Sequence, residues 1–162
     1  MDRVQPAGTN YRSLLNVCFR IGLFAVTYFL LVRPIQTNLN EETVVPALIN
    51  MAKDNDDIII LANQDDILIE SHTDRFIDIK INPPFNGYFF LALALLWPLG
   101  WSQPMKLIQF YNLGLFIILP FLSLALIQGH FWIAPIINAH EMVYKALFLS
   151  LSIIGLRKEF YT

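Results

Sequence analysis

The amino-acid sequence predicts a membrane α-helical protein with four transmembrane helices and a small extracytoplasmic α+β insertion, a helix plus a three-stranded meander, between helices 1 and 2. Two observations predict this fold class. Of the 162 residues, 56% are hydrophobic and 15% are charged, whereas a soluble domain carries about a quarter charged residues. The charge is also segregated, because ten of the thirteen acidic residues lie between Glu41 and Asp78. Long apolar stretches with one polar excursion are typical of a multi-pass membrane protein.

The first apolar run, residues 14–32 (LLNVCFRIGLFAVTYFLLV), follows a short N-terminal segment, residues 1–13. A cleaved secretory signal ends in small residues, but Arg33 and Pro34 follow this run, so we predict an uncleaved signal-anchor helix. Arg20 lies about one and a half turns inside the run, and its long side chain can reach the membrane surface from there.

Three further apolar runs predict the remaining helices. They cover residues 85–101, 107–127 and 138–156. The first of them measures roughly 25 Å as a helix, slightly less than a hydrocarbon core of about 30 Å. Residues 128–137 are interpreted as an outer loop or an interfacial segment, with Trp132 at headgroup depth and Pro135 breaking the helix.

Basic residues set the predicted orientation. An even number of spans puts both termini on one side of the membrane. That side holds five basic residues near the helix ends: Arg3, Arg12, Lys106, Arg157 and Lys158. The positive-inside rule therefore places residues 1–13 and 157–162 in the cytoplasm and the acidic segment 33–84 outside.

The acidic segment 33–84 has its own pattern. Acidic residues before Pro46 predict the start of a helix. Three short runs, DIIILA, ILIES and RFIDIKI, predict the strands of a meander. Ile77, Ile79 and Ile81 share one face of the last strand. So small a domain is marginally stable alone, and we expect the membrane helices, the lipid interface or a partner subunit to cover this isoleucine face.

No constellation of residues predicts a catalytic, cofactor or metal site. His130, His140 and Glu141 are expected near the outer mouth of the helices, and such a set can bind zinc. Their spacing matches no metalloprotease signature, and Glu141 is placed to pair with Lys145 at i,i+4. The single cysteine, Cys18, excludes an internal disulfide and is interpreted as a small core residue. No basic stripe predicts nucleic-acid binding, and no small-molecule ligand is predicted.

Residues 76–128 read FIDIKINPPFNGYFFLALALLWPLGWSQPMKLIQFYNLGLFIILPFLSLALIQ. The order of an outer strand, prolines, an asparagine, an apolar LALALLWP helix and a short basic turn resembles the small membrane proteins that accompany exosortases. The resemblance implies a protein of the bacterial cytoplasmic (inner) membrane with a role in protein sorting. Exosortases themselves use a cysteine and arginines at the outer membrane face. This chain has no cysteine there, so the resemblance implies an accessory role and transfers no active-site residue.

We therefore expect a non-enzymatic accessory or structural subunit of a membrane protein assembly, embedded in the lipid bilayer beside an integral-membrane partner. The residues expected to contact that partner are Arg33, Ile77, Ile79, Asn86 and Tyr88. The alternative is a membrane enzyme or transporter component. Its outer-face site would be formed by His130, His140, Glu141 and Lys145.

Overall fold

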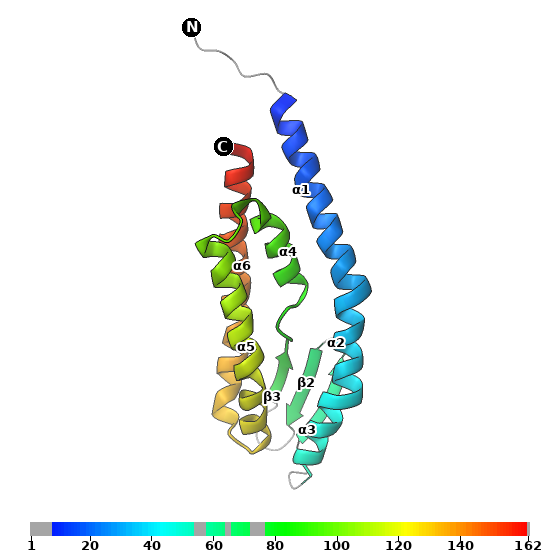
Figure 1. Ribbon diagram of the computed structural model, residues 1–162. Coiled ribbons are helices and arrows are strands. Elements are labelled where there is room, and N and C mark those ends of the chain that lie inside the picture. The colour runs from blue at the N-terminus through cyan, green and yellow to red at the C-terminus, as the bar shows by residue number, and fades with distance from the viewer. Residues whose placement is uncertain (1–7, 54–57, 64–65, 72–76, 162) are drawn as a thin grey trace.

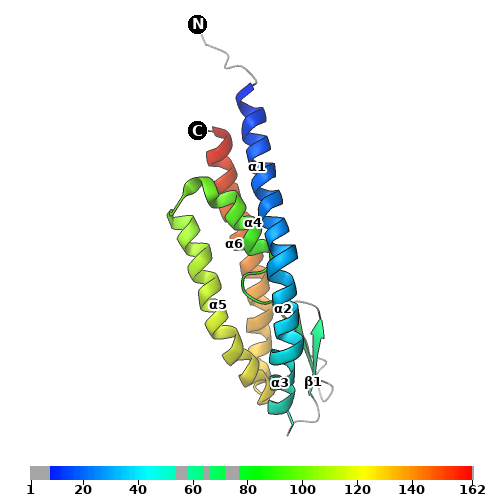
Figure 2. The same ribbon diagram turned by 45° about the vertical axis from the view of Figure 1, so that its right-hand side comes forward.

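The computed structural model describes residues 8–53, 58–63, 66–71 and 77–161. It is an elongated bundle of helices with a small sheet at one end and both termini at the other (Figure 1). In the view of Figure 1 the sheet and the short helix α4 follow one another between the N-terminal helices and the pair α5 and α6, and Figure 2 shows that the sheet lies to one side of α2 and α3.

The chain begins with a continuous helical rod, residues 8–51. Its three α-helices are joined by two five-residue π-helical segments, and the order is α1 (Gly8–Thr27), π (Tyr28–Val32), α2 (Arg33–Leu39), π (Asn40–Val44) and α3 (Val45–Met51). Both prolines of the rod, Pro34 and Pro46, are the second residue after the end of a π segment. Proline lacks the N–H that would bond to the fourth preceding carbonyl, and a locally widened helix accommodates this loss.

The rod corrects the predicted end of the first helix at residue 32. The helix does not stop before Arg33 and Pro34 but continues to Met51. Its apolar stretch Tyr11–Met51 alone is 41 residues long. At 1.5 Å per residue this is about 60 Å, twice a hydrocarbon core of about 30 Å. The second half of the rod therefore extends beyond any one membrane crossing and carries α3 to the sheet. Cys18 is also exposed on α1 rather than in the core.

The three-stranded meander is confirmed. Strands β1 (Ile58–Asn63), β2 (Asp66–Ser71) and β3 (Ile77–Ile81) pair antiparallel in the order β1-β2-β3. Ile69 in the central strand lies opposite Ile60 on one side and Ile79 on the other. This cross-strand row supplies the buried face of the sheet.

The chain's own helices cover that isoleucine face. The buried isoleucines of the sheet pack with Val45 and Leu48 of α3 and with residues at the end of α5 and the start of α6, among them Leu126 and Ile137. Ile79 is 0% exposed. Three candidates to cover this face were expected from the sequence, and the structure shows that helices of the same chain do so.

Two long apolar helices and one short one complete the bundle. They are α4 (Gly87–Leu96, extended by a 3-10 turn to Leu99), α5 (Gln103–Ile127) and α6 (Ala134–Tyr161). By length and composition, three helices can cross a membrane: Tyr11–Met51, Gln103–Ile127 and Phe131–Arg157. The predicted span 85–101 is instead the short apolar helix Gly87–Leu99. At about 20 Å it is shorter than the hydrocarbon core.

Residues 128–137 are more helical than expected. After Gly129 the chain makes a 3-10 turn at Phe131–Ile133 and enters α6 at Ala134. Pro135 therefore lies in the first turn of α6 instead of breaking a helix, a place where proline is tolerated because its missing N–H has no partner there. Trp132 is exposed.

Helix α4 is enclosed by its neighbours. It shares a second buried core with α5 and α6, formed by Phe89, Ala92, Leu96, Met105, Ile108, Tyr144, Phe148 and Leu151. The closest approach is at Gly155 of α6, where an added Cβ would lie 2.5 Å from the carbonyl oxygen of Leu95. Gly155 therefore sets how closely α4 and α6 pack.

Replacing Gly155 with alanine should lower the free energy of unfolding by about 1–3 kcal/mol, the usual cost of overpacking. The matched control is Gly114→Ala in α5, where nothing lies within 4 Å of an added Cβ. Gly114→Ala should be neutral or slightly stabilising, because alanine favours a helix more than glycine does. Thermal unfolding of both variants in one detergent measures the difference, and equal stabilities would contradict this packing account.

Candidate functional site

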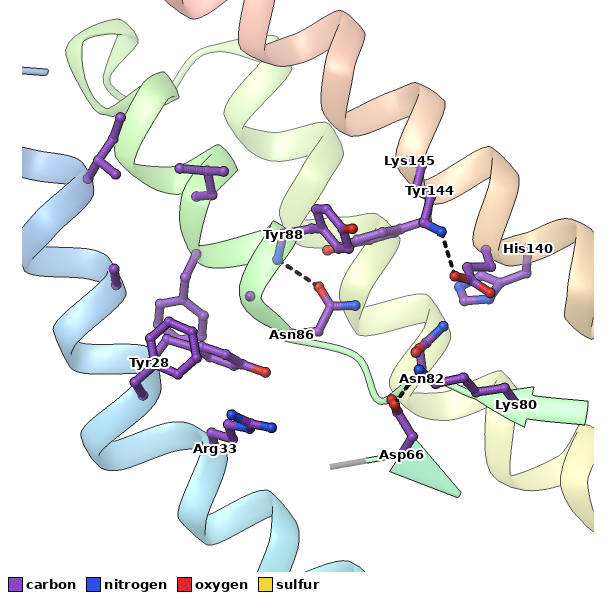
Figure 3. A pocket seen from close by; sticks show the side chains of 17 residues that line it. Tyr28, Arg33, Asp66, Lys80, Asn82, Asn86, Tyr88, His140, Tyr144 and Lys145 are labelled. Carbon is purple, nitrogen blue, oxygen red and sulfur yellow. Dashed lines mark hydrogen bonds and ion pairs between the residues drawn. The ribbon is translucent and has the colours of Figure 1, made fainter. Parts of the chain in front are cut away.

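A cavity of about 720 Å³ lies where the rod, β2, β3, α4 and α6 meet (Figure 3). We call it the junction pocket. Its volume falls within the roughly 300–1,000 Å³ that is typical of small-molecule sites. Side chains far apart in the sequence surround it, from Ile21 in α1 to Lys145 in α6.

One part of the junction pocket is apolar and the other is polar. The apolar part is formed by the rod and α4, through Ile21, Ala25, Phe29, Phe90 and Leu91. The polar part gathers residues from the rod, the sheet, the turn after β3, and α6: Arg33, Asp66, Lys80, Asn82, Asn86, His140, Glu141 and Lys145. Tyr28, Tyr88 and Tyr144 lie among both sets. The pocket is thus amphipathic.

The contacts of the charged groups in the polar part include two ion pairs and a cation–π contact between described residues. Lys80 Nζ lies 2.6 Å from Asp66 Oδ2, and Lys145 Nζ lies 2.7 Å from Glu141 Oε1. The Arg33 guanidinium carbon lies 5.8 Å from the centroid of the Phe29 ring. Among the described lining residues, three cations and two carboxylates give a formal charge of +1 when His140 is neutral. The i,i+4 pair of Glu141 and Lys145 confirms the sequence-based expectation.

The turn between β3 and α4 forms one edge of the pocket and has an unusual backbone. Phe85 has a φ of +59°, a left-handed conformation that is uncommon for a bulky residue. Asn86 then caps α4, because its side-chain oxygen accepts hydrogen bonds from the N–H groups of Tyr88 and Phe89. The next residue, Gly87, packs against the Tyr28 ring, which would lie 3.2 Å from an added Cβ.

Two amide side chains hold this turn from opposite sides. Gln36 of α2 donates from Nε2 to the Pro84 carbonyl at 3.0 Å and to the Phe85 carbonyl at 3.5 Å. Asn112 of α5 accepts the Phe85 N–H through Oδ1 at 2.9 Å. These bonds stabilise a backbone conformation that would otherwise be strained.

Asn112 also connects the turn to the pocket wall. It is 0% exposed, donates from Nδ2 to the Ile108 carbonyl at 2.8 Å, and accepts from the Tyr144 hydroxyl at 3.4 Å. Tyr144 stacks with Tyr111, and both rings lie about 6 Å from the His140 ring. Among the described residues, His140 Nε2 is buried and has no hydrogen-bond partner.

The structure places in one cavity residues that the sequence analysis assigned to two different sites. Arg33, Asn86 and Tyr88, expected to contact a partner, line the same cavity as three residues of the alternative outer-face site, namely His140, Glu141 and Lys145. The fourth residue of that site, His130, lies exposed in the turn between α5 and α6 and does not line the pocket.

Of the two sheet residues in the expected contact set, Ile79 does not line the pocket. Ile79 is fully buried in the chain's own core, so its side chain offers no surface to a partner, and this part of the expectation is corrected. The side chain of Ile77 lies outside the described residues.

Sequence reasoning missed Tyr28, Gln36 and Asn112. A signal existed for Asn112, because an amide inside the apolar run 107–127 needs a hydrogen-bond partner within the protein. Gln36 had no such signal in the sequence, because the first helix was predicted to end before this residue.

Comparisons of the chain with protein-family models, with curated proteins and with solved structures found no match. Within the ranges that the structure describes, no group of three or more His, Cys, Asp or Glu side chains is placed to hold a metal ion.

Replacing Asn112 with leucine should lower the free energy of unfolding by about 1–3 kcal/mol, because the part-buried Phe85 N–H loses its acceptor. Hydrogen–deuterium exchange should accelerate at residues 85–88. Ser123→Ala is the control, since Ser123 is also buried in α5 but bonds only its own helix, at the Leu119 carbonyl. Unchanged exchange at the turn in Asn112→Leu would show that Asn112 does not hold it.

Proposed function

We propose that this protein is a non-catalytic accessory subunit of a membrane protein assembly, and that it binds an integral-membrane partner through the outward face of α1. The observation that carries the proposal is the poor coverage of this helix. In the most apolar window of the rod, 11% of the residues are buried, against 28% in the corresponding windows of Gln103–Ile127 and of Phe131–Arg157. The N-terminal end of α1 also extends past the rest of the bundle (Figures 1 and 2).

Exposed apolar side chains on α1 do not by themselves indicate a protein partner, because lipid tails can cover them equally well. The additional feature is a small-residue notch on the exposed face. Nothing lies within 4 Å of an added Cβ at Gly22, and Cys18, one turn earlier, is also exposed. Large apolar residues flank this notch, among them Phe19, Leu23 and Val26. Transmembrane helices associate where small residues let their backbones approach closely, so a transmembrane helix of another protein fits this face.

The junction pocket supports a binding role in preference to a catalytic one. Each of its carboxylates pairs with a lysine, and none of its described lining residues is a serine, threonine or cysteine. These pairings occupy the two carboxylates of the described lining, which would otherwise be candidates for general bases.

The resemblance of residues 76–128 to exosortase companions suggests the first partner to test. In that setting the protein would lie in a bacterial cytoplasmic membrane with both termini inside, as the basic residues near the helix ends favour. Its role would be to assist a sorting enzyme.

Replacing Gly22 with leucine should reduce recovery of the partner at least tenfold, because the added side chain fills the notch. Gly114→Leu is the matched control, since Gly114 is also a helical glycine with nothing near its Cβ position, but on α5. Both variants are purified in mild detergent, and bound membrane proteins are quantified by mass spectrometry.

Equal membrane insertion of the two variants is the condition for the comparison. A partner retained by Gly22→Leu, or a wild-type chain that purifies with no other membrane protein in stoichiometric amount, would overturn the proposal.

A further inference from the structure

We infer that the junction pocket binds a membrane phospholipid with an anionic headgroup. The headgroup lies at Arg33, Lys80 and Lys145, and an acyl chain lies along α1 and α4. This inference is independent of the partner proposed above, and it assigns a ligand where the sequence predicted none.

The apolar part of the pocket is suited to a hydrocarbon chain. Ile21, Ala25 and Phe29 come from the rod and Phe90 and Leu91 from α4, and none of these side chains can donate or accept a hydrogen bond. A peptide strand in this part would leave its backbone groups without partners, at a cost of several kcal/mol per group. An acyl chain has no such groups to satisfy. Phe29 is 56% exposed, so the apolar part is reached from the outside of the bundle.

The polar part is suited to a phosphate. A guanidinium can bind two phosphate oxygens at once, and Arg33 extends from the rod into the cavity (Figure 3). Lys80 and Lys145 each bind one carboxylate, and a lysine ammonium has three N–H donors. Lys145, whose printed ion pair is with Glu141, therefore keeps donors for a further acceptor. The formal charge of +1 on the described lining residues favours an anionic headgroup over a zwitterionic one.

Neutral donors surround the same space. Asn86 uses its side-chain oxygen to cap α4, which leaves its Nδ2 group as a donor. Asn82 lines the pocket beside it (Figure 3). Glycerol and headgroup hydroxyls are ligands for such groups.

The order of the two parts along the chain matches the depth profile of a bilayer. Ile21, Ala25 and Phe29 lie within the apolar run 14–32, and Arg33 follows directly after it. A chain–headgroup molecule held here would have its hydrocarbon at the depth of lipid tails and its phosphate at the surface, where basic residues attract anionic lipids.

The test is native mass spectrometry of the full chain with dioleoyl phosphatidylglycerol, compared with dioleoyl phosphatidylcholine and with glycerol phosphate. Phosphatidylglycerol should bind at one molecule per chain. Phosphatidylcholine should bind at least several-fold more weakly, and glycerol phosphate, which lacks the chains, should show no binding at the same concentration. Equal binding of the two lipids would refute the headgroup assignment, and binding of glycerol phosphate alone would refute the acyl-chain assignment.

Two pairs of variants locate the site. Arg33→Gln should reduce phosphatidylglycerol binding about tenfold, and Arg12→Gln, at an exposed position of α1 outside the pocket, should not. Ala25→Phe should block the apolar part, whereas Val26→Phe changes the neighbouring outward-facing residue and should leave binding intact.

Thermal unfolding of all four variants is measured in parallel, and a variant that unfolds more than a few degrees early is replaced by its milder form, Arg33→Lys or Ala25→Leu. Wild-type levels of phosphatidylglycerol on both Arg33→Gln and Ala25→Phe would overturn the inference, because lipid would then be bound elsewhere.

Discussion

The fold depends on how the chain turns from the sheet into α4 at Phe85. At that point the backbone leaves the sheet and enters a buried, apolar part of the bundle, where an unpaired N–H group costs about 1–3 kcal/mol. Asn112 removes this cost by accepting the Phe85 N–H, and Gln36 binds the carbonyls on the other side of the turn. Because the two amides come from different helices, the turn also ties the N-terminal rod to α5.

This connection explains why the junction pocket has a polar part and an apolar part side by side. The turn separates the core that the sheet makes with α3, α5 and α6 from the core that α4 makes with α5 and α6. Between these cores the backbone groups and the charged ends of β2 and β3 need partners, and Asp66, Lys80, Glu141 and Lys145 pair among themselves. The junction pocket is the space that remains between paired charges and apolar helix faces.

The sequence predicted the local elements better than their connections. Alternating isoleucines between turn residues were sufficient for the three strands, and i,i+4 spacing was sufficient for the ion pair of Glu141 and Lys145. The continuous rod was not foreseen, because the residue before a proline is biased away from helical conformations and π widening leaves no clear pattern in the residues. The pocket was not foreseen either, since it depends on the rod passing Arg33 and thereby placing Gln36 beside Pro84.

The unbroken rod has a mechanical consequence. A transmembrane helix tilts when the bilayer becomes thinner or thicker, and an intact helix transmits that tilt along its full length. In this chain the far end of the rod is α3, which packs on the sheet, while one wall of the junction pocket belongs to the rod and another to α6. A change in the tilt of the rod would therefore move its wall of the junction pocket relative to α6 and would change the width of the pocket.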